Sequence, residues 1–409
     1  MIDIKKLKSD PDWFQKKIQE KGINILVKNV VELEKERNTI LKSTEELNQK
    51  RKIISKSKNP SEEGKKIKAD LKKLEESLKI VETKFQDTLS KIPNPAFDEV
   101  PIGGEDKSLV VGKNFEPVKF NFTPKAHEEL GKSLNIIDIE SAAKVSGSRF
   151  YYLRGKGAEL ELALLNYARE IIAEKNFVFI LPPVLINSLS MKGMGYLEHG
   201  GNEESYYLEK DDLYLVGTAE QSIGPMHRDE VLNVDQLPLR YMGYSPSFRR
   251  ESGSYGKDTK GIIRVHQFNK LEMFVFCTPE QSQFEHNLIL ELEKTLVEGL
   301  KLPYQILNIA SGDLGLPAAK KYDIEVWFPS QLRYRETHST SNTTDFQSRR
   351  LNIKFVNKNN EKELVHTVNG TAFAFGRIIA AIMENFQTES GSIIIPDVLH
   401  KYTGFKSIE

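Results

Sequence analysis

The stretch from Phe248 to Phe276 constrains the fold of this chain most, because two strand-like limbs flank one glycine-containing loop. The loop, Ser252 to Gly261, has the composition of a flexible turn. The second limb is rich in β-branched and aromatic residues, which favours a strand. Its face with Leu271 and Met273 is too apolar for an isolated surface ribbon. The stretch therefore predicts an antiparallel hairpin inside a larger sheet.

The other face of the second limb carries side chains suited to a ligand. Side chains two residues apart on a strand share a face. That face holds Arg264, His266, Phe268, Lys270 and Glu272, and the first limb adds Arg249 and Glu251. The strand carries a guanidinium, an aromatic ring and a carboxylate along roughly 25 Å. These groups could bind a phosphate tail, a stacked base and a small amine side by side. The alternative is a solvated hairpin whose charges face water.

Composition excludes several classes of protein. The 409 residues allow two or three domains, and 58 basic residues balance 58 acidic ones, so no global basic field indicates a nucleic-acid partner. The single cysteine, Cys277, excludes a disulfide framework and a cysteine-rich structural zinc site. The N-terminus lacks an apolar signal core, and the apolar runs are too short to cross a membrane. We therefore expect a soluble cytoplasmic protein without a membrane partner.

Heptad periodicity predicts a helical hairpin near the N-terminus. After a short helical cap over residues 1 to about 27, apolar residues recur every seven positions at Leu26, Leu33, Ile40, Leu47 and Ile54. A stricter seam follows at Ile67, Leu71, Leu74, Leu78, Val81 and Phe85. A turn signal at 58–61 joins the two, so we expect an antiparallel coiled-coil arm over about 28–92. With the Pro/Gly-rich linker at 93–106, this gives an N-terminal domain over 1–103 and a second domain over 104–409.

Positive charge is concentrated at the turn end of this arm. Residues 50–73 contain ten basic side chains and three acidic ones. The basic ones are Lys50, Arg51, Lys52, Lys56, Lys58, Lys65, Lys66, Lys68, Lys72 and Lys73. Such a surface binds a phosphate backbone by releasing counterions. The alternative is an ordinary lysine-coated, solvated coiled coil.

Two strand-like segments lead into polar residues that could bind small ligands. The strand at 214–217 leads into Thr218, Ala219 and Glu220, for which a helix cap is the usual explanation. The strand at 322–327 precedes Glu336 and Ser339, a carboxylate and a hydroxyl three residues apart. Such oxygens can hold Mg²⁺, although a Ser/Thr-rich turn explains them equally well.

The last motif places an arginine at a helix start. The segment 369–377 predicts a strand and a glycine turn, and an amphipathic helix follows over 378–387. Arg377 would lie where the helix dipole disfavours a cation. Compensation is therefore expected from Glu384, from Glu389 or from a bound phosphate.

The wording FRRESGSYGKDTKGIIRVHQF resembles the second motif of class II aminoacyl-tRNA synthetases, and specifically the seryl-tRNA synthetase family of bacterial and organellar type. The segment ending in Arg377 resembles the third motif. A helix at 159–175, followed by a strand and Pro182-Pro183, resembles the first, which builds a homodimer interface in that family. The resemblance implies an α+β fold, with a mainly antiparallel sheet flanked by helices and an N-terminal arm that grips tRNA(Ser).

The resemblance also implies an activity and a set of site residues. The activity is activation of L-serine by ATP and Mg²⁺ to seryl-adenylate, then transfer to tRNA(Ser) and to tRNA(Sec). Arg249, Arg264 and Arg377 would be catalytic. ATP would contact these three arginines and also Arg250, Glu251, Val265, Phe268, Glu336, Thr337, His338 and Ser339. Serine would contact Thr218, Ala219, Glu220, Arg249, Glu272 and Thr371, and Mg²⁺ would contact Glu336 and Ser339. His338 and Thr340 stand where relatives carry small residues.

Three alternatives remain open at this level. A synthetase-like ligase that loads a carrier protein would lack the basic arm. A non-catalytic RNA-binding paralogue would have no reason to keep all the arginines and carboxylates above. Selectivity for another small amino acid is only weakly addressed by sequence. No catalytic Cys-His or Ser-His-Asp set is apparent, which suits a reaction that depends on positioning and charge neutralisation.

Overall fold

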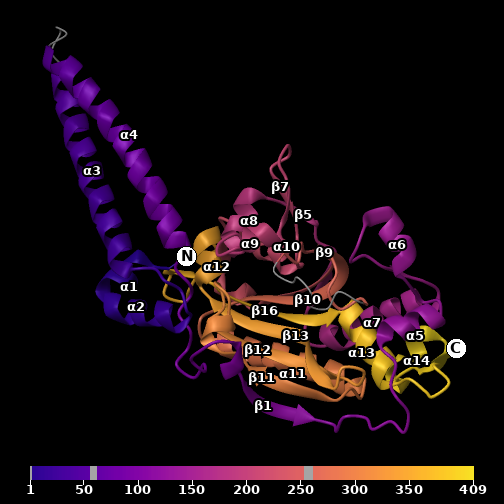
Figure 1. The fold of residues 1–409 in the computed structure, drawn as a ribbon. Helices are drawn as coiled ribbons and strands as arrows, with labels where there is room; N and C mark the ends of the chain where they lie inside the picture. Colours follow the sequence, from indigo (N-terminus) through magenta and orange to yellow (C-terminus); the bar gives the residue numbers. More distant parts are fainter. Residues whose placement is uncertain (1, 56–61, 253–260) are drawn as a thin grey trace. The chain divides into compact units, whose positions relative to one another are not determined.

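The computed structural model describes residues 2–55, 62–252 and 261–409 (Figure 1). The chain divides into two compact units, Met1–Pro95 and Ala96–Glu409. In the described residues no helix is both long and apolar enough to cross a membrane. The turn predicted at 58–61 and most of the loop before Gly261 lie outside the described residues.

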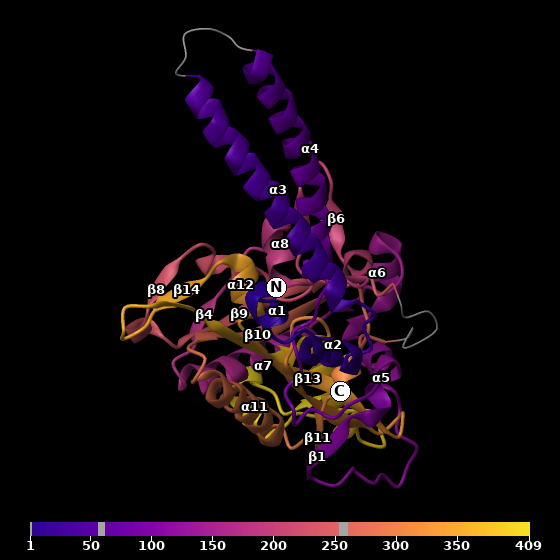
Figure 2. The ribbon, with the colours of Figure 1, turned by 90° about the vertical axis from the view of Figure 1, so that its left-hand side faces the viewer.

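The first unit is helical. Two short helices, α1 (Ile4–Ser9) and α2 (Pro11–Glu20), precede the long helices α3 (Val27–Ile54) and α4 (Glu62–Ser90). The side chain of Asp10 caps α2 by accepting a hydrogen bond from the Trp13 amide. Helices α3 and α4 run side by side, as Figure 2 shows. The predicted helical hairpin is thus confirmed.

One polar position in the α3 seam has a specific partner. Arg37 forms an ion pair with Glu82 of α4, and its guanidinium lies 5.9 Å from the ring centre of Phe85. The long Arg37 side chain therefore packs against the apolar seam of α4 while its charge is paired. This explains how the seam tolerates a polar residue at that heptad position.

The second unit is built on an eight-stranded sheet (Figure 1). Its order is β1 (Leu109–Asn114), β11 (Tyr304–Asn308), β12 (Lys320–Phe328), β13 (Arg333–Thr344), β16 (His366–Ala374), β10 (Gln267–Cys277), β9 (Leu239–Phe248) and β4 (Val178–Ile180). All neighbours are antiparallel except β4 and β9, which are parallel. The mainly antiparallel α+β fold is therefore confirmed.

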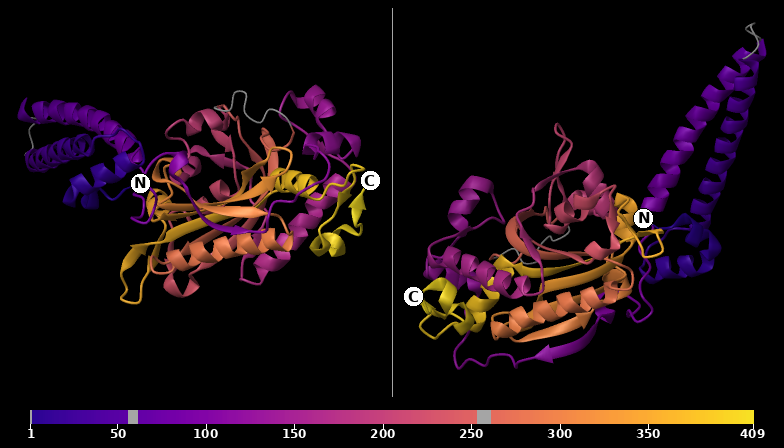
Figure 3. Two further views of the ribbon diagram at one scale, coloured as in Figure 1. Left: turned by 60° about the horizontal axis from the view of Figure 1, so that its bottom comes forward. Right: turned by 180° about the vertical axis from the view of Figure 1, so that it is seen from behind.

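Helices cover this sheet and leave one part of it open. Helices α7 (Lys156–Ala173), α11 (Ser282–Gly299) and α13 (Phe375–Asn385) share the main core with Leu271 and Met273 of β10, and Figure 3 shows α11 lying along one face. On the other side Phe274 and Phe276 of β10 share a second core with residues of α8 (Ser188–Met194), α10 (Glu220–Ile223) and α12 (Phe346–Leu351). The beginning of β10 is not covered in this way, and the cavity described below lies there.

The remaining elements are short. They are α5 (His127–Ser133), β2 (Ile137–Asp138), α6 (Ile139–Ser146), β3 (Tyr152–Leu153), β5 (Leu185–Asn187), α9 (Gly201–Glu204), β6 (Tyr206–Leu208), β7 (Leu213–Leu215), β8 (Val231–Asn233), β14 (Lys354–Val356), β15 (Lys362–Leu364), β17 (Ile393–Ile394), α14 (His400–Thr403) and β18 (Ser407–Ile408). Single turns of 3₁₀ helix lie at 105–107, 224–227, 234–236, 311–313 and 397–399.

The structure corrects three local predictions. The strand of the second limb begins at Gln267 and not at Arg264, because the His266 amide donates to the carbonyl of Arg149 instead of joining the ladder. Gly376 lies inside α13, so no glycine turn precedes that helix. The Ser/Thr-rich segment 334–342 belongs to strand β13 and is not a turn.

Candidate active site

A cavity of about 830 Å³ lies where β9, β10, β13 and β16 meet the N-terminus of α13. Most of the residues singled out from sequence line it: Thr218, Glu220, Arg249, Glu251, Val265, Phe268, Glu272, Glu336, Thr337, Ser339, Thr371 and Arg377. Ala219, Arg250, Arg264 and His338 are not among its lining residues. Residues far apart in sequence thus form one polar chamber.

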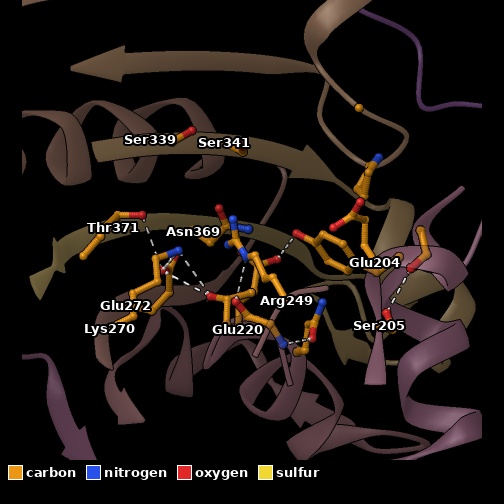
Figure 4. A pocket seen from close by; sticks show the side chains of 18 of the residues that line it. Glu204, Ser205, Glu220, Arg249, Lys270, Glu272, Ser339, Ser341, Asn369 and Thr371 are labelled. Carbon is orange, nitrogen blue, oxygen red and sulfur yellow. Dashed lines mark hydrogen bonds and ion pairs between the residues drawn. The ribbon is translucent and has the colours of Figure 1, made fainter. Parts of the chain in front are cut away.

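A buried group of charged and hydroxyl side chains forms one end of the cavity (Figure 4). We call Thr218, Glu220, Lys270, Glu272 and Thr371 the carboxylate cluster. Lys270 forms an ion pair with Oε2 of Glu272, and that oxygen also accepts hydrogen bonds from Thr218 Oγ1 at 3.3 Å and Thr371 Oγ1 at 3.5 Å. Pairing across the sheet sets this geometry, because Glu272 lies opposite Thr371 in the β10–β16 register.

The second carboxylate of the cluster is held differently. Glu220 begins α10 and accepts a hydrogen bond from the hydroxyl of Tyr196. Burial, followed by the nearby charge of Glu272, raises the pKa of Glu220 to about 7. Two carboxylates therefore share one ammonium, that of Lys270. With both ionised, the cluster keeps one negative charge for a cationic ligand.

Arg249 connects this end of the cavity to an aromatic wall. Its Nε donates to the carbonyl of Gly217 at 3.2 Å, and its guanidinium lies 5.3 Å from the ring centre of Phe268. This cation–π contact fixes the arginine and covers one side of the ring. A base stacked on Phe268 would therefore use the side that Arg249 does not cover.

The opposite end of the cavity is basic. Arg377, in the first turn of α13, donates to the carbonyl of Glu336 at 2.9 Å and lies 3.3 Å from the Glu336 carboxylate. The anion that compensates Arg377 in the protein is thus Glu336. The expectation of Glu384 or Glu389 is wrong, because Glu384 is buried against His127 and Glu389 is exposed to solvent.

The carboxylates behind this end suit a divalent cation. Asp323 lies opposite Ser339 in the β12–β13 register, is 7% exposed, and its Oδ1 has no hydrogen-bond partner among the described residues. Burial is the main cause that raises its pKa to about 7. A buried carboxylate oxygen beside Ser339 and Glu336 matches the oxygen ligands that Mg²⁺ prefers. Within residues 2–55, 62–252 and 261–409, no group of three or more His, Cys, Asp or Glu is placed to hold a metal alone.

Comparison with known proteins identifies the family. The seryl-tRNA synthetase N-terminal domain matches residues 1–96, and the tRNA synthetase class II core domain (G, H, P, S and T) matches residues 206–386. The serine–tRNA ligase of Thermobifida fusca is 48% identical over 82% of this chain and 79% of that protein. The chain belongs to the seryl-tRNA synthetase family. The serine–tRNA ligase of Corynebacterium efficiens, 45% identical over 84% of this chain and 81% of that protein, agrees.

Solved structures of seryl-tRNA synthetases share the whole architecture. The enzyme of Pyrococcus horikoshii complexed with ATP has a TM-score of 0.92 and 37% identity, with 100% of this chain and 99% of that chain covered. The cytoplasmic enzyme of Naegleria fowleri in complex with AMP has a TM-score of 0.86 and 31% identity, with 98% and 96% covered. The resemblance inferred from the motifs is therefore confirmed, including the arm.

Four residues expected at the site of a seryl-tRNA synthetase lie outside the cavity wall. Ala219 belongs to the apolar core, and Arg264 pairs with Glu251 at 3.0 Å. The Arg250 guanidinium lies 4.6 Å from the ring centre of Tyr206. His338 is buried 5.8 Å from the ring centre of Phe373, and burial lowers its pKa to about 3, so it is neutral.

Several residues that complete the cavity received no role from the sequence. Lys270 was placed on the ligand face of β10 by its parity with Glu272, but no ligand contact was assigned to it. Tyr196, Asn369 and Lys321 also line the cavity. Tyr196 reaches it from the loop after α8, and no local pattern places it next to Glu220.

The unusual pKa of Glu220 gives a testable stability profile. In the unfolded chain this carboxyl loses its proton near 4.5, whereas in the folded protein it keeps the proton until about 7. Ionisation therefore opposes folding increasingly across this window and by a constant amount above it.

Relative to the unsubstituted protein, Glu220→Gln is expected to gain stability as pH rises through the window, by about 3 kcal/mol at most. Urea unfolding across this pH range measures this difference in stability, with the exposed Glu159→Gln as control. Parallel stability profiles for the Glu220 variant and the parent would contradict the prediction.

Proposed function

We propose that this chain is a serine–tRNA ligase that activates L-serine with ATP and transfers it to tRNA(Ser). The observation that carries the proposal is the carboxylate cluster, in which two carboxylates and two threonine hydroxyls adjoin Arg249 in one cavity. Such a site offers a negative charge to an amino group, hydroxyls to a hydroxyl and a guanidinium to a carboxylate. Serine carries all three groups.

The reaction follows from the order of groups along the cavity. A serine carboxylate oxygen would attack the α-phosphorus of ATP, the bond to the bridging oxygen would break, and pyrophosphate would leave. A ribose hydroxyl at the tRNA end would then attack the acyl carbon and release AMP. No protein nucleophile is needed, because such transfers depend on positioning and charge neutralisation.

We assign roles to the chain's own residues accordingly. Arg249 would hold the α-phosphate and the serine carboxylate, while Arg377 would hold the phosphate tail. Arg264 would join Arg377 on the tail by giving up its 3.0 Å pair with Glu251. Phe268 would stack on adenine, with Glu251 nearby. Mg²⁺, held by Glu336 and Ser339 with the ATP phosphates, would supply neutralisation of the phosphate charge. When ATP binds, Arg377 would exchange its contact with Glu336 for phosphate oxygens.

Discrimination against alanine follows from the hydroxyls. Thr218 and Thr371 both donate to Glu272 in the structure, and serine would insert its own polar groups among them. A site built to pair a substrate hydroxyl rejects an analogue that lacks it, because buried polar groups are then left unpaired. We therefore expect alanine to be excluded.

The proposed assembly is a homodimer in the cytoplasm. Leu162 of α7, Val178 of β4 and Leu181 are 56%, 56% and 72% exposed, and these elements belong to the segment that resembles the first class II motif. A second copy would cover these apolar side chains. Charging of tRNA(Sec) is included in the proposal because the resemblance to the seryl-tRNA synthetase family implies it.

The basic end of the arm is proposed to bind tRNA. Replacing four exposed lysines there, Lys50, Lys52, Lys66 and Lys73, by glutamate is expected to lower kcat/KM for tRNA charging roughly hundredfold at moderate salt, because phosphate contacts are lost. The salt dependence should flatten as well. Pyrophosphate exchange, which needs no tRNA, should persist.

The matched control replaces four exposed lysines toward the other ends of the same helices, Lys28, Lys35, Lys79 and Lys84. It has the same change in net charge and should charge tRNA nearly normally. Equal losses in both variants would contradict the assignment of Lys50, Arg51, Lys52, Lys56, Lys58, Lys65, Lys66, Lys72 and Lys73 to tRNA, of which Lys56 and Lys58 lie outside the described residues.

The function itself is tested by ATP–pyrophosphate exchange with serine, and with alanine, threonine and glycine in parallel. Exchange with serine alone supports the proposal. Absence of exchange with every amino acid would overturn it and leave RNA binding by the arm as the remaining function.

A further inference from the structure

The backbone from Gly261 to Ile263 joins the loop of the second motif to strand β10, and its side chains Ile262 and Ile263 line the cavity. Among the residues that the structure describes, this short segment belongs to no strand. It is held instead by three contacts to residues of helices α5 and α13. We call these contacts the Ile262 clamp.

The first contact is a hydrogen bond to a buried histidine. The Ile262 amide donates to Nε2 of His127 over 3.2 Å, and Nδ1 of His127 lies 2.8 Å from Oε1 of Glu384. Nε2 is therefore the acceptor, and Nδ1 carries the proton that it donates to the carboxylate. His127 is 2% exposed and Glu384 is fully buried. Gly261 has φ +75°, and a Cβ there would lie 2.0 Å from Nε2, so the approach requires glycine.

The other two contacts come from the start of α13. A Cβ on Gly376 would lie 2.8 Å from the carbonyl oxygen of Ile262, so only glycine lets the backbone approach this closely. Arg377 Nε donates to the carbonyl of Ile263 at 3.4 Å. Arg377 and Glu384 are seven residues apart on one helix, about two turns. Helix α13 thus holds the Ile263 carbonyl directly through Arg377. It holds the Ile262 amide indirectly, because Glu384 fixes His127 of α5.

Glu384 has no contact with the cavity that would give it another role. Its Oε1 also accepts from the His127 amide at 3.2 Å, and its Oε2 accepts from the Ser330 amide at 3.1 Å. Neither His127 nor Glu384 is among the residues that line the cavity. Its three protein donors satisfy the pairing that a buried carboxylate requires, and one of them is the ring of His127.

We infer that His127 and Glu384 are positioning residues for ATP, acting through the Ile262 clamp. The inference rests on the proposed function. The clamp sets where the chain enters β10, and hence where Val265 and Phe268 meet the nucleotide. The carboxylate cluster lies farther along β10 and is held by β16, so serine binding does not depend on the clamp.

The test compares two substitutions of one residue. His127→Phe fills the ring volume but offers no acceptor, whereas His127→Gln can present Oε1 close to where Nε2 lies. For His127→Phe, KM for ATP in the exchange reaction is expected to rise roughly tenfold, the effect of one buried amide left unpaired. KM for serine should stay within about twofold of the parent value. For His127→Gln, KM for ATP should return most of the way to that of the parent. The Kd for ATP, measured by calorimetry on the full chain, should follow KM.

The control is His400→Phe, which removes a 2.9 Å contact between a histidine and the Ile395 carbonyl away from the cavity. Thermal unfolding of every variant shows which of them fold. If His127→Phe does not fold, Glu384→Gln provides the second test, because glutamine has one acceptor oxygen where the carboxylate uses two. Equal rises in KM for ATP and serine, or no difference from His400→Phe, would overturn the inference. An unsubstituted protein without exchange would instead overturn the proposed function.

Discussion

Replacing Glu272 by glutamine is expected to lower kcat/KM for serine in pyrophosphate exchange by roughly a hundredfold to a thousandfold, the effect of breaking a buried ion pair. Glu272 is 1% exposed and is the shared acceptor for Lys270, Thr218 and Thr371. Glutamine keeps the shape but removes the charge that pairs with Lys270 and that is proposed to pair with the serine ammonium. KM for ATP should change little, since Arg249, Phe268 and Arg377 are untouched.

The matched control for this variant is Glu285→Gln. Glu285 is also 1% exposed and forms a buried ion pair, with Arg240 at 2.6 Å, but it does not line the cavity. Both variants should lose stability on urea unfolding, because each removes the charged partner of a buried or partly buried cation, Lys270 or Arg240. Only the Glu272 variant should lose serine specificity. If Glu285→Gln impaired serine kinetics as strongly, the effect would be one of stability and the serine assignment of Glu272 would fail.

The parts of the fold that sequence predicted are those with a local periodicity. The seven-residue repeat marked α3 and α4, and the two-residue alternation around Leu271 and Met273 marked β10. The ligand face followed from the same alternation, because Phe268, Lys270 and Glu272 share one parity. Such patterns need no knowledge of what packs against them.

The contacts that sequence could not predict depend on the order of strands. Arg377 is compensated by Glu336 because β13 and β16 are neighbours, although 41 residues separate the two in the chain. Glu384 is nearer in sequence but points to His127. The bend before Gln267 arises from the Arg149 carbonyl, which is more than a hundred residues away. No spacing rule within a segment contains this information.

The buried carboxylates show the same limit in chemical terms. Glu220 and Asp323 have pKa values near 7 mainly because the folded chain removes them from water. In sequence each is one acid among 58. Tyr196, which donates to Glu220, comes from a separate segment. Many of the residues that line the cavity could thus be found from motifs. Their protonation states could be inferred only from their burial in the folded chain.

Replacing Arg249 by lysine is expected to reduce kcat in pyrophosphate exchange by roughly a hundredfold or more, although the positive charge is kept. The planar guanidinium donates to the Gly217 carbonyl while its face lies over Phe268, and the remaining donors are proposed to hold both the serine carboxylate and the α-phosphate. An ammonium can fill only one of these roles at a time. Because the α-phosphate and the serine carboxylate react with each other, the loss should appear in kcat more than in either KM.

Arg240→Lys is the control for this last substitution, because it also keeps the charge and loses the guanidinium. Arg240 donates through Nε and Nη2 to both oxygens of Glu285 and through Nη1 to the Lys175 carbonyl, and it does not line the cavity. Its loss should lower stability and leave kcat near that of the parent. A high kcat for Arg249→Lys, measured with saturating serine and ATP, would mean that charge alone suffices there. The bridging role of Arg249 between the two reacting groups would then be wrong, and Arg249 would act by electrostatic attraction of the substrates.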